Sequence, residues 1–375
     1  MAEIPTPPPT EGRGFSKRNF FKVAAVAAGV GIAIRAGFKA REMLRQVGKE
    51  DKVEEIDGTK ITYEEFKPEG KEVVDPTKAV IYLTGFPWSA AEKSIHKFPQ
   101  VLTNSFGMRG FIIDTKRERD DSDSLAKQAD STRKFFKQKG IKEVVLVSQS
   151  LGVIKQAYLT VNLETTDDIK VKSVIAANPR GLDKMGKRDL VAKFAKDVFK
   201  VGLEEKVRNE QNKIKIVTPE ADPKEIQQGF IRSILRNVKY FGWQYAPLLW
   251  SQLKTLTEID PIFKQIKAPV LLFVASKDLV SETEKYIPGQ KVVPEHKDTK
   301  KEQVDANRIA MTQTTKGRER YLKENIFTSA QEVKVLETSR LGDHLAVPGP
   351  RAQQVADISA KYPERSRKIT PPKTA

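Results

Sequence analysis

The sequence predicts an α/β fold in which a mainly parallel β-sheet is flanked by helices, and three observations lead to it. Short apolar runs rich in β-branched residues alternate with amphipathic helical stretches along most of the chain. Several runs are continuously apolar, which is typical of parallel strands buried on both faces of a sheet. One connection is far longer than the roughly two to six residues usual in such a sheet, which indicates an inserted element.

Composition bounds the class of protein. The 375 residues are 39% hydrophobic and 31% charged, which is typical of a globular chain with a substantial core and excludes a polytopic membrane protein, a coiled coil and a disulfide miniprotein. The absence of cysteine excludes thiolate metal sites and cysteine nucleophiles, and three histidines are available for imidazole chemistry. The net charge of +17 favours solubility and is compatible with an anionic partner.

The first 45 residues are predicted to be a targeting segment rather than a folded domain. Residues 1–14 are rich in proline and lack apolar periodicity, so we expect a disordered lead-in. The segment from Ser16 to Lys22 (SKRNFFK) resembles a twin-arginine export signal, with Lys17 in place of the first arginine. The uncharged run 23–34 that follows would make about 18 Å of helix, short of the roughly 30 Å hydrocarbon core of a bilayer.

Export or membrane anchoring is the expectation that follows from this leader. No small-x-small cleavage site follows the apolar run, because large residues stand in the places where small ones are needed. Lys22 and Arg35 flank the run and can extend to the membrane interface, which favours retention on the extracytoplasmic side. The alternative is a basic amphipathic leader on a cytoplasmic protein.

The folded part begins with a predicted hairpin, because residues 53–63 alternate apolar and polar side chains around Asp57-Gly58. Six further strands are expected at Ala79–Leu83, Gly110–Ile113, Val144–Val147, Val171–Ala176, Val270–Val274 and Val333–Leu336. Helices are expected at Ser124–Lys139, Leu151–Val161 and Arg351–Tyr362. These elements divide the core into a first part, 50–182, and a second part, 263–362.

Residues 183–262 are the predicted insertion, and their spacing indicates helices. Asp189–Val207 and Pro223–Leu256 carry apolar residues at helical spacing, and the second segment is rich in aromatic residues. We expect these aromatics to form the packing face of a lid, with a substrate-facing or lipid-facing role as the alternative. A charged insertion is expected over 281–328, and a basic tail over 363–375.

A strand, a sharp turn and a helix are predicted to meet at Ser150. The strand Val144–Val147 runs directly into Ser148-Gln149-Ser150-Leu151-Gly152 and then into a helix, which is the context of a nucleophile elbow. In such an elbow the serine lies on a strained turn, and the residues two before and two after it must be small. Gly152 meets this requirement, and Ser148 stands where glycine is usual.

An activated serine needs a base, and the base needs an orienting carboxylate, in the chain order serine, acid, histidine for this architecture. Asp278 lies just beyond the expected strand 270–274 and is the candidate acid. Asp183, which follows the expected strand 171–176, is the next candidate. Both positions come after the carboxyl end of a predicted strand.

The candidate base is His344. Of the three histidines, it alone lies in a loop immediately after a strand of the predicted sheet, the one at 333–336. His96 lies in a polar helical stretch and His296 in the charged insertion, so both are expected to be ordinary surface histidines.

A tetrahedral intermediate needs two N–H donors for its oxyanion. The segment Thr84-Gly85-Phe86-Pro87 follows the first expected parallel strand, and Gly85 lets the chain turn toward the nucleophile. The N–H groups of Phe86 and Leu151 are the expected donor pair, because Pro87 has no N–H.

From about Val53 to Lys361 the chain resembles an α/β-hydrolase. The Asp-Gly hairpin, Thr-Gly-Phe-Pro, Ser-x-Ser-x-Gly, the aspartate after a strand and Gly-Asp-His-Leu-Ala occur in that family's order. The resemblance implies an eight-stranded sheet with a helical cap after the sixth strand. It also implies hydrolysis through an acyl-serine, with Ser150 as nucleophile, His344 as base and acid, and Asp278 as orienter. The departures are Ser148 for glycine and a threonine before Gly85 where the family often has histidine.

The expected function is a serine hydrolase that cleaves a carboxylic ester, acyl or amide bond, with a hydrophobic substrate favoured by the aromatic segment. Two alternatives stay open: a triad enzyme that acts on a non-ester bond, and a catalytically silent, membrane-attached binding module. No cofactor and no metal are expected, because acyl transfer through a serine needs none, and no P-loop motif occurs.

The expected partner is a small-molecule or lipid-like acyl substrate, with a membrane surface contacted through the N-terminal segment. Only the positive charge suggests a nucleic-acid partner, and no known nucleic-acid-binding motif accompanies it. Nucleic-acid binding is therefore not expected.

Overall fold

The computed structural model describes residues 52–70, 73, 75–85, 88–117, 121–179, 182, 232–233, 236–237, 251–252, 254–256, 258–274, 315–337 and 352–366. The predicted leader, most of the predicted insertion 183–262 and most of 281–328 lie outside these residues, as do the aromatic residues of the second helical segment. Across the described ranges, no helix combines the length and the apolar character needed to span a bilayer.

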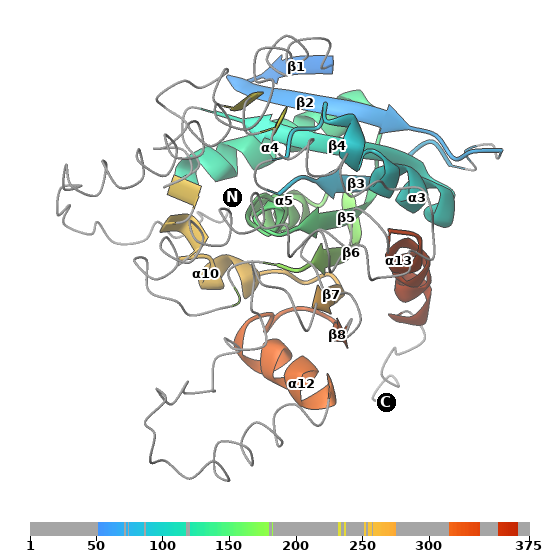
Figure 1. Cartoon of the computed structure of the whole chain (residues 1–375). Helices are drawn as coiled ribbons and strands as arrows, with labels where there is room; N and C mark the ends of the chain where they lie inside the picture. The colour runs from blue at the N-terminus through green and yellow to red at the C-terminus, as the bar shows by residue number, and fades with distance from the viewer. Residues whose placement is uncertain are drawn as a thin grey trace, which may run out of the picture. The chain divides into compact units, whose positions relative to one another are not determined.

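A single eight-stranded sheet organises the described part of the chain, with the strand order β1-β2-β4-β3-β5-β6-β7-β8 (Figure 1). The strands are β1 (Lys52–Ile56), β2 (Thr59–Phe66), β3 (Lys78–Leu83), β4 (Arg109–Lys116), β5 (Glu143–Gln149), β6 (Lys170–Ala177), β7 (Val270–Val274) and β8 (Val333–Glu337). β2 pairs antiparallel with both of its neighbours, and every pair from β4 to β8 is parallel. The predicted mainly parallel sheet and all of its expected strands are confirmed.

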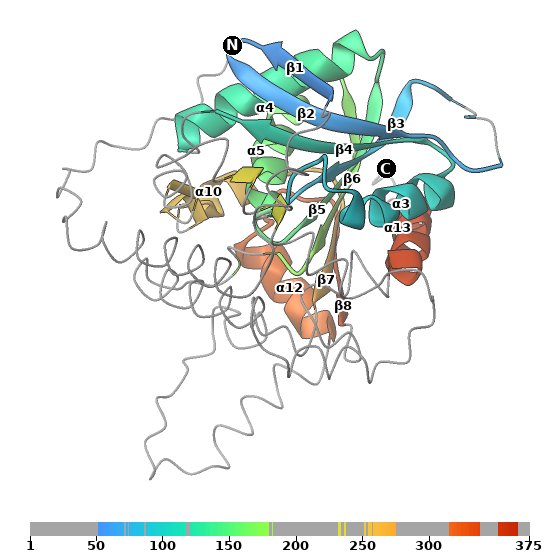
Figure 2. The ribbon, with the colours of Figure 1, turned by 45° about the horizontal axis from the view of Figure 1, so that its top comes forward.

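The hairpin that opens the sheet turns at Asp57 and Gly58. Both residues have positive φ, 49° and 70°, as a two-residue turn that matches the twist of the flanking strands requires. Ile56 pairs with Thr59, so only these two residues form the turn. The sheet twists strongly from β2 to β8. In Figure 2, β2 runs from side to side, whereas β7 and β8 run steeply from bottom to top.

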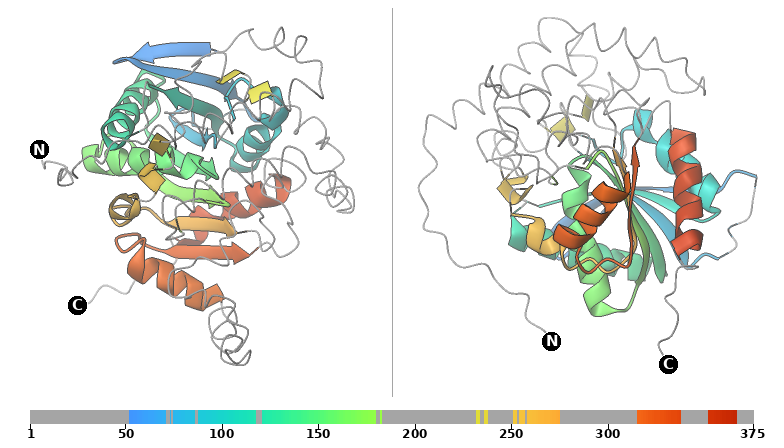
Figure 3. Two further views of the ribbon diagram at one scale, coloured as in Figure 1. Left: turned by 60° about the vertical axis from the view of Figure 1, so that its left-hand side comes forward. Right: turned by 90° about the horizontal axis from the view of Figure 1, so that it is seen from below.

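Helices cover both faces of the sheet (Figure 3). On one face, α3 (Lys97–Phe106) packs against α13 (Ala352–Ser366). On the other face lie α4 (Ser122–Gln138), α5 (Gly152–Thr166), α10 (Asp260–Phe263) and α12 (Thr315–Asn325). A short 3-10 helix, η1 (Lys93–Ile95), precedes α3.

The apolar runs of the sequence form the core between these layers. On the α4 and α5 face, Phe135 and Phe136 pack with strand residues such as Ile81 and Phe111, and all four side chains are fully buried. On the α3 face, the Tyr82 ring meets the Phe98 ring edge-on, with centroids 5.2 Å apart. The sheet is therefore buried on both sides, which is why its strands read as continuous apolar runs.

The helix predicted to end at Tyr362 is longer than expected. α13 continues through Pro363 to Ser366, so the first four residues of the predicted tail 363–375 are helical. Proline lacks a backbone N–H and its ring crowds the carbonyl four residues before it, yet the helix continues past Pro363.

Candidate active site

The chain reverses sharply between β5 and α5, and Ser150 lies at the reversal. Its φ of 52° falls in the left-handed region, which costs a residue with a Cβ about 1–2 kcal/mol. The other non-glycine residues with positive φ in the described ranges are aspartates or asparagine, whose side chains tolerate this region better. The strand, strained turn and helix predicted around Ser150 are therefore present.

Backbone hydrogen bonds hold this elbow on the sheet. The N–H of Ser150 donates to the carbonyl of Ala177 at the end of β6 over 3.0 Å, and the N–H of Val153 donates to the carbonyl of Ser150 over 3.3 Å. Ser150 is buried. The backbone of Ser150 is thus held at the carboxyl edge of the parallel strands, where binding sites of such sheets lie.

Glycine is required on both sides of the elbow because the backbone approaches so closely. A Cβ on Gly152 would lie 2.5 Å from the carbonyl oxygen of Leu83. A Cβ on Gly85 would lie 2.4 Å from the carbonyl oxygen of Gln149 and 3.1 Å from the Ser150 Cβ. The segment that follows β3 therefore packs directly against the elbow, at the place where the sequence predicts an oxyanion donor.

Ser148, which stands where glycine is usual before the elbow, forms a side-chain hydrogen bond. Ser148 Oγ donates to Gln156 Oε1 over 2.7 Å, and Gln156 Nε2 donates to the carbonyls of Leu146 and Ile175 over 2.8 and 2.9 Å. All of these groups are buried. The extra hydroxyl of Ser148 thus joins a network that ties β5, β6 and α5 together, which accounts for serine at this position.

A second contact holds the other face of the elbow strand. The buried Tyr82 hydroxyl donates to Gln149 Oε1 over 3.0 Å. Burial raises the pKa of Tyr82, so the phenol stays a protonated donor. The two residues before Ser150 are therefore both anchored by side-chain hydrogen bonds.

A buried charge cluster lies near the same edge of the sheet. Asp114, at 5% exposure, accepts from Lys155 of α5 over 3.2 Å and pairs with Lys116 over 3.1 Å. Burial alone would raise the pKa of the Asp114 carboxyl, but the two ammonium groups outweigh it and hold the pKa below its usual value.

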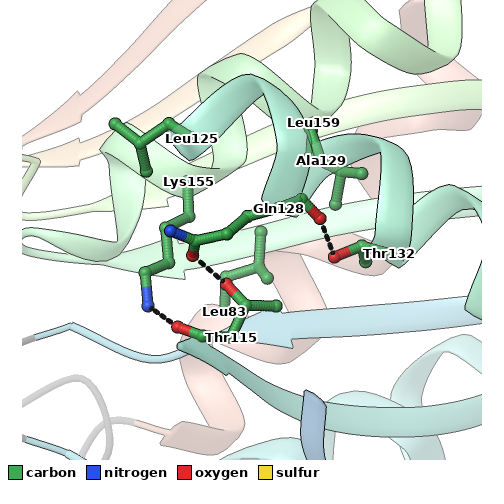
Figure 4. A pocket seen from close by; sticks show the side chains of 8 residues that line it. All are labelled: Leu83, Thr115, Leu125, Gln128, Ala129, Thr132, Lys155 and Leu159. Carbon is green, nitrogen blue, oxygen red and sulfur yellow. Dashed lines mark hydrogen bonds between the residues drawn. The ribbon is translucent and has the colours of Figure 1, made fainter. Parts of the chain in front are cut away.

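A small cavity adjoins this cluster, and Figure 4 shows Lys155, Gln128 and Thr115 lining it together. Thr115 Oγ1 donates to Gln128 Oε1 over 2.7 Å. The cavity measures about 10 Å³, far below the roughly 300–1,000 Å³ of a substrate pocket, so it is not the place where a substrate binds.

The remaining predicted site residues lie outside the described part of the chain: Asp278, its alternative Asp183, His344 and the oxyanion donor Phe86. Their preceding strands are described. β5 to β8 pair in parallel, so the carboxyl ends of β7 and β8 lie at the same edge as the elbow. Leu151, the other predicted donor, occupies the N-cap position of α5.

The prediction that His96 is an ordinary surface histidine is wrong. Its ring is half-buried, Nε2 lies 2.6 Å from the carbonyl oxygen of Ala90, and the ring meets Phe66 edge-on. Burial lowers the pKa of His96, although the hydrogen bond to Ala90 opposes this shift. The imidazole bridges the segment after β3 to the start of α3, a contact that residue spacing does not reveal. His296 lies outside the described residues.

Within the described ranges, no three histidine, aspartate or glutamate side chains gather closely enough to hold a metal ion.

Comparisons with known proteins support the fold. No protein-family model and no curated protein matches the chain. The Cfl2 protein of Burkholderia cenocepacia is similar in structure, at 12% identity and a TM-score of 0.50, over 83% of this chain and 95% of that one.

Two further solved structures are similar to the chain. An epoxide hydrolase of Vigna radiata is 17% identical over 84% of this chain and 98% of that one, with a TM-score of 0.47. A thermophilic esterase of Thermogutta terrifontis is 13% identical over 85% and 97%, with a TM-score of 0.46. The strand order, together with the likeness to known structures, assigns the chain the α/β-hydrolase fold.

Proposed function

We propose that this protein is a serine hydrolase that cleaves a carboxylic ester, acyl or amide bond through an acyl-serine intermediate. The observation that carries the proposal is the strained Ser150 at the turn from β5 to α5, with the glycine-lined backbone of the segment after β3 packed against it. A turn conformation that costs free energy is kept where it positions a reacting group.

In the proposed reaction Ser150 Oγ attacks the carbonyl carbon while His344 takes the hydroxyl proton. His344 then gives that proton to the departing alcohol or amine, and Asp278 orients the imidazole and stabilises its charged form. Water attacks the acyl-serine in the second half, with His344 again as base. The support for these two partners is their position in the sequence after β7 and β8, whose carboxyl ends share the edge of Ser150.

The proposed oxyanion hole uses the N–H groups of Leu151 and Phe86. The first N–H groups of a helix lack intrahelical acceptors, and Leu151 caps α5. The helix dipole also favours negative charge at this end. Support for Phe86 comes from its neighbour Gly85, where an added Cβ would lie 3.1 Å from the Ser150 Cβ.

The proposed substrate is hydrophobic, and the proposed location is the extracytoplasmic side of a membrane. The hydrophobic substrate is inferred from the aromatic residues of the insertion 183–262, which we propose forms a helical cap. The extracytoplasmic location is inferred from the leader around Arg18. Replacing Lys17 and Arg18 together by glutamine should leave the protein in the cytoplasm on cell fractionation. Unchanged export would overturn the proposed role of the leader.

Hydrolysis of p-nitrophenyl esters of increasing acyl length tests the activity. We expect Ser150→Ala and His344→Ala to lower kcat by at least about a thousandfold, and Asp278→Asn to impair it severely. The matched control is Ser173→Ala, which removes a buried hydroxyl on the neighbouring strand β6 and should leave kcat unchanged. Equal turnover by wild type and Ser150→Ala would overturn the assignment, and turnover by neither above the uncatalysed rate would favour a silent binding module.

A further inference from the structure

A buried ion pair joins the predicted insertion to the segment after β3. Glu92, at 3% exposure, receives two hydrogen bonds from the Arg232 guanidinium: Nη2 to Oε1 over 2.6 Å and Nε to Oε2 over 3.2 Å. The two residues are 140 positions apart in the sequence. Bidentate pairing of this kind fixes geometry as well as supplying binding energy.

Glu92 ends a compact run of turns that begins at Gly85. The N–H of Trp88 donates to the carbonyl of Gly85 over 2.8 Å, and the N–H of Glu92 donates to the carbonyl of Ser89 over 3.0 Å. Trp88 and Ser89 are buried. A displacement of Glu92 should therefore be passed along two hydrogen-bonded turns to Gly85, which lies so close to the elbow that a Cβ on it would be 3.1 Å from the Ser150 Cβ.

Two further contacts come from the same short segment of the insertion. Arg236 Nη1 donates to Ser89 Oγ over 3.4 Å, and Asn237 Oδ1 accepts from Lys116 Nζ over 3.1 Å. Arg232 and Arg236 are both helical, and both donate to the segment after β3. Arg232 and Arg236 thus bind the segment after β3, and Asn237 binds β4.

We propose that Arg232 and Glu92 are positioning residues that hold the turn beginning at Gly85 against the Ser150 elbow, and so align the oxyanion donors. This inference rests on the proposed hydrolase function. Neither side chain touches the reacting atoms in this scheme. Their pairing couples the docking of the insertion to the geometry that stabilises the transition state.

Small displacements of the oxyanion donors are enough to slow the reaction. Without Arg232, the buried Glu92 carboxylate keeps its hydrogen bonds from the Ser94 N–H and hydroxyl but loses its cation. It should then move toward water, because a buried charge without a counter-charge is costly. An oxyanion donor stabilises the transition state more than the ground state, and a shift of about 1 Å costs on the order of a hundredfold in rate. The loss should therefore fall on kcat rather than on KM.

The experiment measures kcat and KM on a short-chain p-nitrophenyl ester for the full chain. Glu92→Gln and Arg232→Met should each lower kcat by about 10- to 100-fold with KM within about threefold, and the double variant should be no slower than the slower single variant. Arg232→Lys keeps the positive charge but loses the two-point pairing of the guanidinium with the carboxylate. It should lower kcat less than Arg232→Met does.

A second glutamate–arginine ion pair, which lies between β2 and β4, serves as the control. Glu65 accepts from Arg109 Nε over 2.9 Å, and its pair lies at the amino end of β4, away from the elbow. Glu65→Gln should leave kcat unchanged. Thermal melting of every variant identifies those that do not fold.

Wild-type kcat in folded Glu92→Gln and Arg232→Met would overturn the inference. If Arg232→Met does not fold, wild-type kcat in Arg232→Lys would overturn it. A rise in KM with constant kcat would do so too, because it would place the pair in substrate binding. Failure of the proposed function is distinguishable, since in that case wild type and Ser150→Ala would turn over ester equally.

Discussion

Ser148 Oγ donates a 2.7 Å hydrogen bond to Gln156 Oε1, across the junction where β5 turns into α5. Both side chains are fully buried, and the same glutamine donates to one carbonyl of β5 and one of β6. The pair fixes the helix that carries the Ser150 elbow to the two strands beneath it.

Ser148→Ala should lower the free energy of unfolding by about 1–3 kcal/mol, because it leaves a buried acceptor of Gln156 without this donor. Urea unfolding measures the change. Ser173→Ala is the control, since Ser173 is also a fully buried serine but its hydroxyl has no hydrogen-bond partner among the described residues. Equal losses in the two variants would contradict the role given to the Ser148–Gln156 pair.

Gly152→Ala should displace the elbow, because its Cβ would lie 2.5 Å from the carbonyl oxygen of Leu83. Relief of such a clash in a packed core costs about 1–3 kcal/mol and moves the backbone. We expect slower reaction of Ser150 with a fluorophosphonate, measured as a labelling rate. Gly140→Ala is the comparison: its Cβ would meet nothing within 4 Å, and the strain from its φ of 69° falls on the turn before β5, at the other end of that strand from the elbow. An unchanged labelling rate in Gly152→Ala would be inconsistent with this geometry.

Asp114→Asn should lower the free energy of unfolding by about 3–5 kcal/mol, since it leaves the ammonium groups of Lys116 and Lys155 near a neutral amide. The control is Asp168→Asn, because Asp168 also pairs with two cations, Arg133 and Lys137, but on the surface. There the loss should be no more than about 1 kcal/mol. Similar losses in denaturant unfolding would show that burial of the cluster is unimportant.

His96 should make stability depend on pH below about 6.5, the ordinary pKa of histidine. Burial lowers its pKa in the folded state, so the unfolded chain binds the proton more readily. The stability of the neutral form is present above that ordinary value and is lost as pH falls through the folded pKa.

His96→Gln removes this titration, so its stability should fall less steeply than wild type between pH 7.5 and 5. Melting temperatures across this range measure both profiles. Parallel profiles would refute the prediction, because the other two histidines and all carboxylates are the same in both proteins.

The strands and the elbow could be predicted because their signals are local. β5 is a continuous apolar run, Asp57-Gly58 favours one kind of turn, and Gly152 follows Ser150 at the spacing that an elbow needs. Gln156 gave a weaker local signal, as a polar residue within an apolar helix. Its role depends on the neighbouring strands, and spacing alone did not indicate it.

Long-range pairs could not be predicted in this way. Arg232 lies 140 residues from Glu92, and neither residue stands in a motif that indicates a partner. His96 was misassigned for the same reason, since burial beside Ala90 and Phe66 is set by how the segment after β3 folds back onto α3. Such contacts follow from the tertiary arrangement rather than from periodicity.

Intact-mass analysis after fluorophosphonate treatment tests the central claim most directly. Full-length wild type, Ser150→Ala and the matched Ser173→Ala are treated side by side, with folding verified by circular dichroism. We predict one adduct on wild type and on Ser173→Ala, and none on Ser150→Ala. An adduct on Ser150→Ala, or none on folded wild type, would contradict the claim that Ser150 is an activated nucleophile.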